Sequence, residues 1–309
     1  MRSARPWREA WHDALYGHDG FFLREEPAAH FRTSVHASTF FAEALVRLAR
    51  DRGLRTVVDL GSGGGELLTA MREHSEPGEL ELVGVDIARR PLGLAADIEW
   101  LRDVPATFDG LLVANEWLDN VVCDVVQLDS DAVVRFVLVD PETGDEQLGE
   151  PCSDPWLSRW WPLDGAGVAV PGLRAEVGSA RDDAWSAAVD HLGHGVAVAV
   201  DYGHLLQTRP PLGSLRSYRD GHEVSVRPDG SRDVTAHVAV DAVAARVGGR
   251  LQSQREALAG LGVAATWPDA ALAARDPLAY VEALSRAGEA VELTACGGLG
   301  ELWWITAER

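Results

Sequence analysis

Residues 56–67 (TVVDLGSGGGEL) constrain the fold of this chain more than any other segment. An apolar run leads into Gly61, Gly63 and Gly65, and a helix-forming sequence follows from Glu66. Glycines let the backbone approach a ligand closely, and the first turn of the following helix presents free N–H groups to negative charge. This strand–loop–helix pattern predicts an α/β fold with a nucleotide-binding turn.

Two acidic residues near this loop favour one cofactor over another. A dinucleotide fingerprint needs glycine at position 66, where the carboxylate of Glu66 would repel a pyrophosphate. Asp59, two residues before the loop, suits an ammonium or a sulfonium, as in the methionine part of S-adenosyl-L-methionine. Asp86 follows an expected strand, 25 residues after Gly61, and suits two ribose hydroxyls. We therefore expect S-adenosyl-L-methionine rather than NAD; the alternative is a tight turn with Asp86 as a helix cap.

The remaining pattern predicts a Rossmann-like fold, with a mostly parallel sheet flanked by helices. Expected strands are 56–60, 80–85, 108–114, 195–200 and 302–306, and expected helices are 39–50, 180–192 and 240–247, the last one opened near Thr235 or His237. We expect a helical extension at 1–30, a main domain at 31–309, and within it a β-rich insertion at 121–171 with a hairpin around 129–131 and three tryptophans, Trp156, Trp160 and Trp161. Long functional loops are expected at 201–233.

The charge of the chain excludes several functions. All 28 basic residues are arginine, so no mechanism can use a lysine, and the net charge of −20 argues against nucleic acid and anionic membranes as partners. A neutral or basic acceptor is favoured. Three separated cysteines (Cys123, Cys152 and Cys296), an N-terminus without an apolar signal segment and the absence of a long apolar run predict a soluble cytoplasmic protein with reduced thiols. No metal site is expected.

Several motifs, taken in order along the chain, resemble one known family. They are Phe31–Ser34 (FRTS), Asp59–Gly65, Ala114–Asp119 (ANEWLD), Asp201–Gly203 (DYG), Ser217–His222 (SYRDGH), Asp233–Val238 (DVTAHV) and the QRE segment at 254–256. The chain resembles the MidA-like class I S-adenosylmethionine-dependent methyltransferases, relatives of the mitochondrial complex I assembly-factor arginine methyltransferases. The sequence departs from the family pattern after Asp86, at the added Asp220 and at Arg255.

The resemblance implies a class I fold, S-adenosyl-L-methionine as methyl donor with S-adenosyl-L-homocysteine as product, and a protein arginine as acceptor. It also implies that Phe31, Thr33 and Ser34 close over the cofactor. Trp100, at the end of a short third strand, could flank adenine or could be a core residue. Asn115 follows the strand at 108–114 and is expected to face the cofactor crevice.

Four residues are the expected catalytic set: Glu116, Asp119, Asp201 and His237. Carboxylates bind a guanidinium in bidentate fashion, and we expect Glu116 to be its main ligand, with Asp119 three residues on as a supporting charge. Asp201 is expected to orient a substrate group or Arg219. His237, or His222, is expected to accept a proton. The alternatives are a capped helix start, a loop anchor and structural histidines.

Three functions stay open on the sequence. The favoured one is protein-arginine N-methylation. A small-molecule N- or O-methyltransferase with a reshaped acceptor site is the second, and a cofactor-binding assembly protein with little turnover is the third. The acceptor is expected to be basic, and a homodimer is left open.

Overall fold

The computed structural model describes residues 4–24, 34, 38–163 and 170–309. Among them the chain divides into two compact units, each built from three separated stretches. The parallel-sheet unit comprises the described parts of Arg32–Asn115, His191–Val200 and Arg250–Arg309. The antiparallel-sheet unit comprises those of Met1–Phe31, Glu116–Asp190 and Asp201–Gly249.

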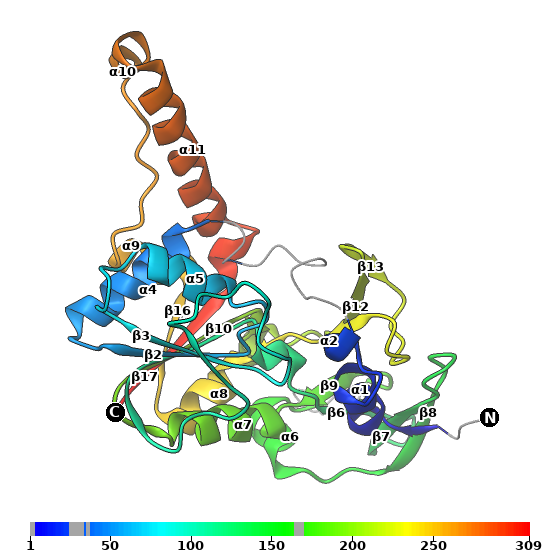
Figure 1. Cartoon of the computed structure of the whole chain (residues 1–309). Coiled ribbons are helices and arrows are strands. Elements are labelled where there is room, and N and C mark those ends of the chain that lie inside the picture. The colour runs from blue at the N-terminus through cyan, green and yellow to red at the C-terminus, as the bar shows by residue number, and fades with distance from the viewer. Residues whose placement is uncertain (1–3, 25–33, 35–37, 164–169) are drawn as a thin grey trace. The chain divides into compact units, whose positions relative to one another are not determined.

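The parallel-sheet unit is built on one twisted sheet (Figure 1). Over the described residues its strand order is β16-β17-β10-β5-β2-β3-β4. The strands are β2 (Thr56–Leu60), β3 (Glu81–Val85), β4 (Glu99–Leu101), β5 (Phe108–Asn115), β10 (Leu192–Asp201, whose last residue already belongs to the other unit), β16 (Arg250–Ser253) and β17 (Trp303–Glu308). β10, β5, β2, β3 and β4 run parallel, and β16 pairs antiparallel with β17. The order reverses between β5 and β2, where parallel α/β sheets bind ligands.

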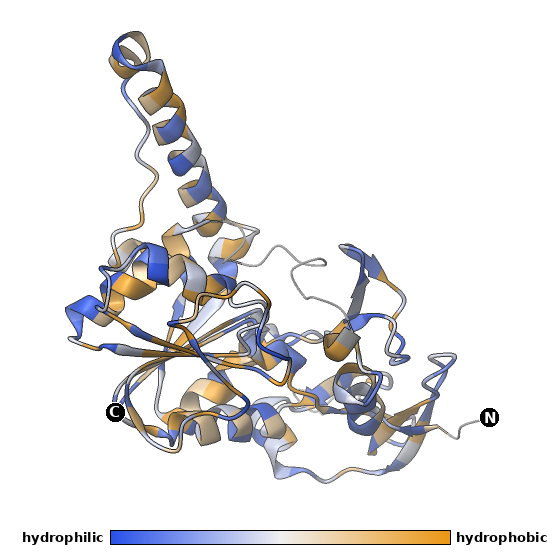
Figure 2. Cartoon of the chain, in the orientation of Figure 1, coloured by the Kyte–Doolittle hydropathy of each residue, from blue (hydrophilic) through white to orange (hydrophobic). Residues whose placement is uncertain are grey.

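Apolar strands and amphipathic helices build the core of this unit. Val57, Val58 and the residues Leu111–Ala114 are fully buried, as expected for central parallel strands (Figure 2). The helices are α4 (Phe40–Asp51), α5 (Glu66–Glu73), α9 (Gln254–Gly260), α10 (Ala270–Arg275), α11 (Pro277–Thr294) and the 3₁₀ turn η5 (Leu299–Glu301). α4 lies on the sheet with the Phe41 ring edge-on to Trp304, at 5.8 Å between centroids.

The antiparallel-sheet unit contains a sheet of β1 (Arg5–Pro6), β6 (Asp124–Leu128), β7 (Val134–Val139), β8 (Glu146–Pro151) and β9 (Arg174–Val177). Two smaller sheets pair β11 (Gly203–His204) with β15 (Val238–Ala239), and β12 (Arg216–Arg219) with β13 (His222–Val224) and β14 (Asp233–Thr235). The helices are α1 (Trp7–Tyr16), α2 (Phe21–Arg24), η2 (Leu118–Asn120), α6 (Pro155–Trp160), α7 (Ser179–Val189), η4 (Leu206–Thr208) and α8 (Val240–Val247).

Tryptophans hold this second unit together. Trp7 and Trp11 of α1 are buried against β6, β7 and β14, and the Trp11 indole N–H donates to the carbonyl of Val234 at 2.7 Å. Trp156 and Trp161 are buried in a second apolar cluster with residues of β6 and β9. These tryptophans are therefore packing residues of the unit.

The structure confirms the expected α/β class and the hairpin, which is β6 and β7 around 129–131. It corrects several expected elements. The helix expected at 180–192 ends at Val189, because β10 begins at Leu192. The helix at 240–247 does not open near Thr235 or His237. Thr235 ends strand β14, His237 lies in the connection to β15, and α8 begins at Val240. The loops expected at 201–233 contain β11, η4, β12 and β13. The expected domain boundaries stay a prediction.

Candidate functional site

The glycine loop connects β2 to α5 through three left-handed residues. Gly61, Gly63 and Gly65 have φ values of 75°, 55° and 78°, which side chains other than glycine rarely adopt. A Cβ on Gly65 would lie 2.8 Å from a methyl of Leu94. The loop is held to the neighbouring strand because the N–H groups of Gly61 and Ser62 both donate to the carbonyl of Val85. The backbone is thus preset in the conformation that brings it close to a ligand.

Asp59 lies in the floor of this loop. Its side chain is 2% exposed, and Oδ2 accepts a hydrogen bond of 2.6 Å from the Ser62 hydroxyl. Burial, together with the charges of Asp86 and Glu66, raises the pKa of Asp59 to about 7. A positive charge on a ligand would favour the ionised carboxylate. The position therefore fits the cationic end of S-adenosyl-L-methionine.

Asp86 follows β3 directly and fixes the loop from the other side. Its Oδ2 accepts from the Gly63 N–H at 2.9 Å and its Oδ1 from the Ala88 N–H at 2.8 Å. Burial raises the pKa of this carboxyl. The residues directly after Asp86, 87–98, form no helix, so the alternative that Asp86 caps a helix is wrong. Each carboxylate oxygen has a second lone pair, which leaves the expected acceptance from ribose hydroxyls chemically available.

Trp100 lies in β4, beside the loop. The ring packs on Gly84 of β3 so closely that a Cβ there would lie 2.6 Å from it, and the indole N–H donates to the Ala88 carbonyl at 3.2 Å. Gly84 and Leu94 were not among the expected site residues. The glycine inside an otherwise apolar strand (ELVGV) is the sequence signal for such a close approach.

The other expected cofactor residues are placed less completely. Ser34 is buried, and its hydroxyl accepts from the Gln254 side-chain amide at 3.1 Å. Phe31 and Thr33 lie outside the described residues. Asn115 is the last residue of β5, opposite Val200 of β10. Gln254, from the QRE segment, is the partner that sequence reasoning did not assign to the site.

Glu116 is the first residue of the antiparallel-sheet unit after β5. It has a φ of 50°, in the left-handed region that glutamate rarely occupies, and its side chain is half-buried. Such strain persists only where the surrounding structure fixes it, and it marks a candidate functional residue. The expectation that Glu116 and Asp119 share one helical turn is wrong, because η2 begins only at Leu118.

Asp119 and Asp201 are buried carboxylates within the same unit. Asp201 accepts at Oδ2 from the N–H groups of Leu118 and Asp119, at 2.8 and 3.1 Å, and its Oδ1 has no hydrogen-bond partner among the described residues. Asp119 accepts from the hydroxyl of Thr235 at 2.6 Å. Burial raises the pKa of both carboxyls, and the charges of Asp119 and Glu116 raise the pKa of Asp201 further. Asp201 thus anchors the η2 loop. This is the loop-anchor role that the sequence left open beside the orientation of a substrate group or Arg219.

Arg181 of α7 organises the same region and was not expected to. Its Nη2 donates to the carbonyl of Asp119 at 2.7 Å, its Nε to that of Val121 at 3.0 Å and its Nη1 to that of His237 at 2.9 Å. The side chain is 2% exposed. One guanidinium therefore joins the segment that carries Asp119 to the segment that carries His237.

His237 is exposed, and its ring stacks on Tyr202 at 5.9 Å between centroids. Desolvation and the charges of Arg216 and Arg181 lower the pKa of His237, so the ring is neutral at pH 7 and can accept a proton. His222 lies in β13 and is also exposed. Asp233 of β14 is a further buried carboxyl: burial and the charge of Asp119 raise its pKa to about 8.

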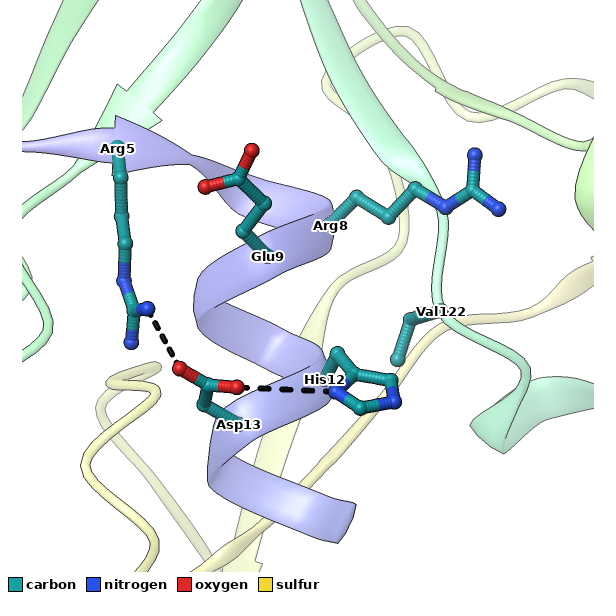
Figure 3. Close-up of a pocket in the computed structure, with 6 residues that line it drawn as sticks. All are labelled: Arg5, Arg8, Glu9, His12, Asp13 and Val122. Atoms are coloured by element: carbon teal, nitrogen blue, oxygen red, sulfur yellow. Dashed lines mark hydrogen bonds and ion pairs between the residues drawn. The ribbon is translucent and has the colours of Figure 1, made fainter. Parts of the chain in front are cut away.

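A surface hollow of about 370 Å³ lies beside α1, and Figure 3 shows the residues that line it. It is lined by Arg5, Arg8, Glu9, His12, Asp13 and Val122, with Arg5 paired to Asp13 at 2.6 Å. None of the expected site residues lines it. Across the described ranges there is no cluster of His, Cys, Asp and Glu side chains that could hold a metal ion. Searching those same ranges also reveals no helix that is both long and apolar enough to span a bilayer.

Comparison with known proteins identifies the family. Residues 84–256, more than half of the chain, match the family described as "Putative S-adenosyl-L-methionine-dependent methyltransferase". The chain belongs to this family. Its cofactor is therefore S-adenosyl-L-methionine, and the broad resemblance to methyltransferases is confirmed. No curated protein matches the chain.

Two solved structures from Burkholderia thailandensis resemble this methyltransferase in fold. One is a COG1565 superfamily member bound to S-adenosyl-homocysteine, with a TM-score of 0.78 and 23% identity over 99% of this chain and 88% of that one. The other is a native structure from the same superfamily, with a TM-score of 0.76 and 23% identity over 99% and 87%. The expected class I methyltransferase fold is thereby confirmed.

Proposed function

We propose that this methyltransferase transfers the methyl group to a protein arginine guanidinium. The observation that carries the proposal is the acidic surrounding of Glu116. The charges of Glu116 and Asp119 both act on Asp201, and that of Asp119 acts on Asp233. Arg181, a buried cation of the same unit, lowers the pKa of Asp119 and of Asp201 through its charge, but its three hydrogen bonds go to backbone carbonyls and not to these carboxylates. A cationic acceptor would favour the ionised form of these carboxyls and would lower their pKa values again.

Within this acidic group Glu116 is the proposed guanidinium ligand. Asp119 and Asp201 are buried, and they accept hydrogen bonds from Thr235 and from the backbone of η2. Glu116 is half-buried and lies in a strained backbone conformation directly after β5. A carboxylate holds a guanidinium through two parallel hydrogen bonds and fixes the orientation of its nitrogens. Asp119 is proposed as a supporting charge, and Asp201 as the residue that positions η2.

The parallel-sheet unit is proposed to hold the cofactor through the glycine loop, Asp59 and Asp86. S-adenosyl-L-methionine supplies an electrophilic methyl group on a sulfonium. Asp59 would meet its positive end, and Asp86 its ribose hydroxyls. The S-adenosyl-homocysteine bound to the Burkholderia thailandensis relative supports this assignment by analogy of fold. Trp100 and Ser34 are proposed to border the same site.

A guanidinium that gains a methyl group must lose one N–H proton. Glu116 holds the cation and concentrates electron density on the reacting nitrogen. A neutral His237 is the proposed proton acceptor, because its lowered pKa leaves the ring unprotonated at neutral pH. The proton then passes to solvent, since the ring is exposed.

Glu116→Gln tests the proposal, with Glu150→Gln on exposed strand β8 as the matched control. Each variant is incubated with labelled cofactor and a lysate of the native host, and cofactor affinity is measured by calorimetry. We expect Glu116→Gln to bind the cofactor normally and to lose at least 100-fold in transfer to basic proteins, with Glu150→Gln unchanged. Unchanged transfer by Glu116→Gln would contradict the catalytic assignment. Label only on small molecules favours the small-molecule N- or O-methyltransferase, and no label at all favours the assembly protein.

A further inference from the structure

Helix α11 of the parallel-sheet unit presents an apolar surface on one side. α11 and α10 extend as an arm beyond the sheet of this unit (Figure 1). One side of α11 is fixed to α4, because Arg286 pairs with Glu43 and lies 4.2 Å over the Phe40 ring. The opposite side carries Val281, Leu284, Gly288 and Val291, which we call the α11 stripe.

The stripe is solvent-exposed and continuous. Val281, Leu284 and Val291 are 60%, 39% and 42% exposed, and Gly288 is exposed as well. The spacing of three, four and three residues places all four on one line along the helix. Alternating apolar and polar residues along the arm are visible in Figure 2. Apolar residues in such a line usually pack on another helix.

Gly288 is the residue that the isolated chain does not explain. Glycine is a poor helix former, and position 288 lies in the interior of an 18-residue helix. A Cβ at this position would meet nothing within 4 Å, so no contact inside the described structure requires glycine. A second helix that crosses closely at this position would require it, because only glycine leaves room for a large side chain there.

We propose that the α11 stripe binds the same stripe of a second copy of this chain, with the two helices antiparallel. A two-fold axis between positions 284 and 288 exchanges these two positions. Leu284 of each copy then fills the space above Gly288 of the other, and Val281 lies opposite Val291. Large and small residues complement each other twice in one symmetric contact, as a closed two-fold interface demands.

The charges along α11 are compatible with this pairing. The chain carries a net charge of −20, which opposes self-association over most of its surface. The stripe itself has no carboxylate. In the antiparallel register Glu282 lies opposite Ala290 and Glu292 opposite Tyr280, so no two acidic residues face each other. A parallel register would instead place each glutamate beside the same glutamate of the other chain.

Sedimentation velocity of the full chain tests association. We expect a dimer at micromolar concentration, and Leu284→Glu is expected to raise the dissociation constant of the dimer at least 100-fold. Leu92→Glu, a control on a fully exposed leucine of the same unit away from α11, should not change the dissociation constant.

Gly288→Leu removes the space but not the helix propensity, and should also dissociate the dimer while thermal stability is kept. A monomeric wild-type chain, or a dimer that survives both stripe variants, would overturn the proposal. A monomer destabilised by Leu284→Glu would show that the chain itself covers the stripe.

Cross-linking tests the antiparallel register. In a Cys296→Ser background, chains carrying Leu284→Cys are mixed with chains carrying Gly288→Cys and oxidised. The antiparallel pairing predicts that the mixture cross-links at least tenfold faster than either variant alone. Faster self-cross-linking of each single variant would indicate a parallel pair and would contradict this geometry.

Discussion

Asp59 and Asp201 are both buried carboxylates, yet their surroundings give them different roles. Asp201 receives two backbone N–H groups of η2, which makes it a positioning residue for the loop after Glu116. Asp59 receives one hydroxyl, from Ser62, and its carboxylate is otherwise opposed by the negative charges of neighbouring acids. Asp59 is therefore suited to bind a cationic ligand, whereas Asp201 holds the backbone of η2 in place.

Cofactor affinity should therefore depend on pH through Asp59. In the free protein its raised pKa, about 7, leaves the carboxyl partly protonated at neutral pH. A cationic ligand binds the ionised form, so the affinity should rise with pH and level off above the pKa. We expect S-adenosyl-L-methionine to bind about tenfold more tightly at pH 8 than at pH 6. Isothermal titration calorimetry across this range measures the effect.

The matched variant for this prediction is Asp59→Asn, which keeps the shape of the side chain and removes its charge. It should weaken cofactor binding at least tenfold and flatten the pH dependence between pH 6 and 8. A wild-type affinity that falls as pH rises, or an unaltered pH profile in Asp59→Asn, would show that another group controls the binding.

The residues that the sequence predicted best are those whose role is set by their neighbours in the chain. Gly61, Gly63 and Gly65 lie in the expected turn, because the turn between β2 and α5 is local, and the structure shows their backbone to be left-handed. Arg181 was missed for the opposite reason. Its three carbonyl partners lie 56 to 62 residues away in the chain, and nothing in the sequence around α7 indicates them.

At the scale of elements, the turn between β2 and α5 should distinguish two adjacent glycines. Gly65 has a φ of 78° and a Cβ on it would clash with Leu94, whereas the nearest atoms to a Cβ on Gly64 belong to the end of the Glu66 side chain. We expect Gly65→Ala to weaken binding of S-adenosyl-homocysteine at least tenfold and to destabilise the fold by about 1–2 kcal/mol. Gly64→Ala should change either quantity much less. Equal effects of both substitutions in calorimetry and thermal unfolding would contradict this interpretation of the turn.

The η2 loop and the segment before β15 depend on α7 through Arg181. We expect Arg181→Lys to lower kcat at least tenfold and to leave cofactor affinity unchanged, because a lysine cannot reach three carbonyls at once. Arg209→Lys is the matched control, since Arg209 also donates to backbone carbonyls, those of Trp160 and His204. Steady-state kinetics over a pH series checks this. A lower melting temperature with an unchanged kcat would indicate a merely structural role.

Elements were predictable where one segment carries the whole pattern. The apolar strands β2 and β5 and the hairpin of β6 and β7 appear where expected. The short strands β12 and β14 were expected as a loop and a helix start, because their pairing joins Arg216 to Thr235 across the chain. A strand of three or four residues is stabilised by such a distant partner and has little periodicity of its own.

At the scale of the whole molecule, the chain passes repeatedly between its two units. It leaves the parallel sheet after Asn115 and again after Val200, which pair with each other at the ends of β5 and β10. The β-rich insertion expected at 121–171 falls within the first of these passages, whereas no sequence pattern was taken to mark the second, at 201–249. The cytoplasmic location, the basic acceptor and the exclusion of nucleic acids and membranes stay predictions.

The net charge of −20 makes a prediction about acceptor recognition that no single residue makes. A strongly acidic enzyme attracts a basic acceptor over distances up to the Debye length, which shrinks from about 14 Å at 50 mM salt to about 6 Å at 300 mM. For an arginine-rich peptide we expect the KM to rise several-fold over this range, with kcat nearly constant. A peptide with one arginine and compensating glutamates should show a much smaller change. If both peptides respond equally to salt, long-range attraction does not contribute, and recognition depends on the contacts of Glu116 alone.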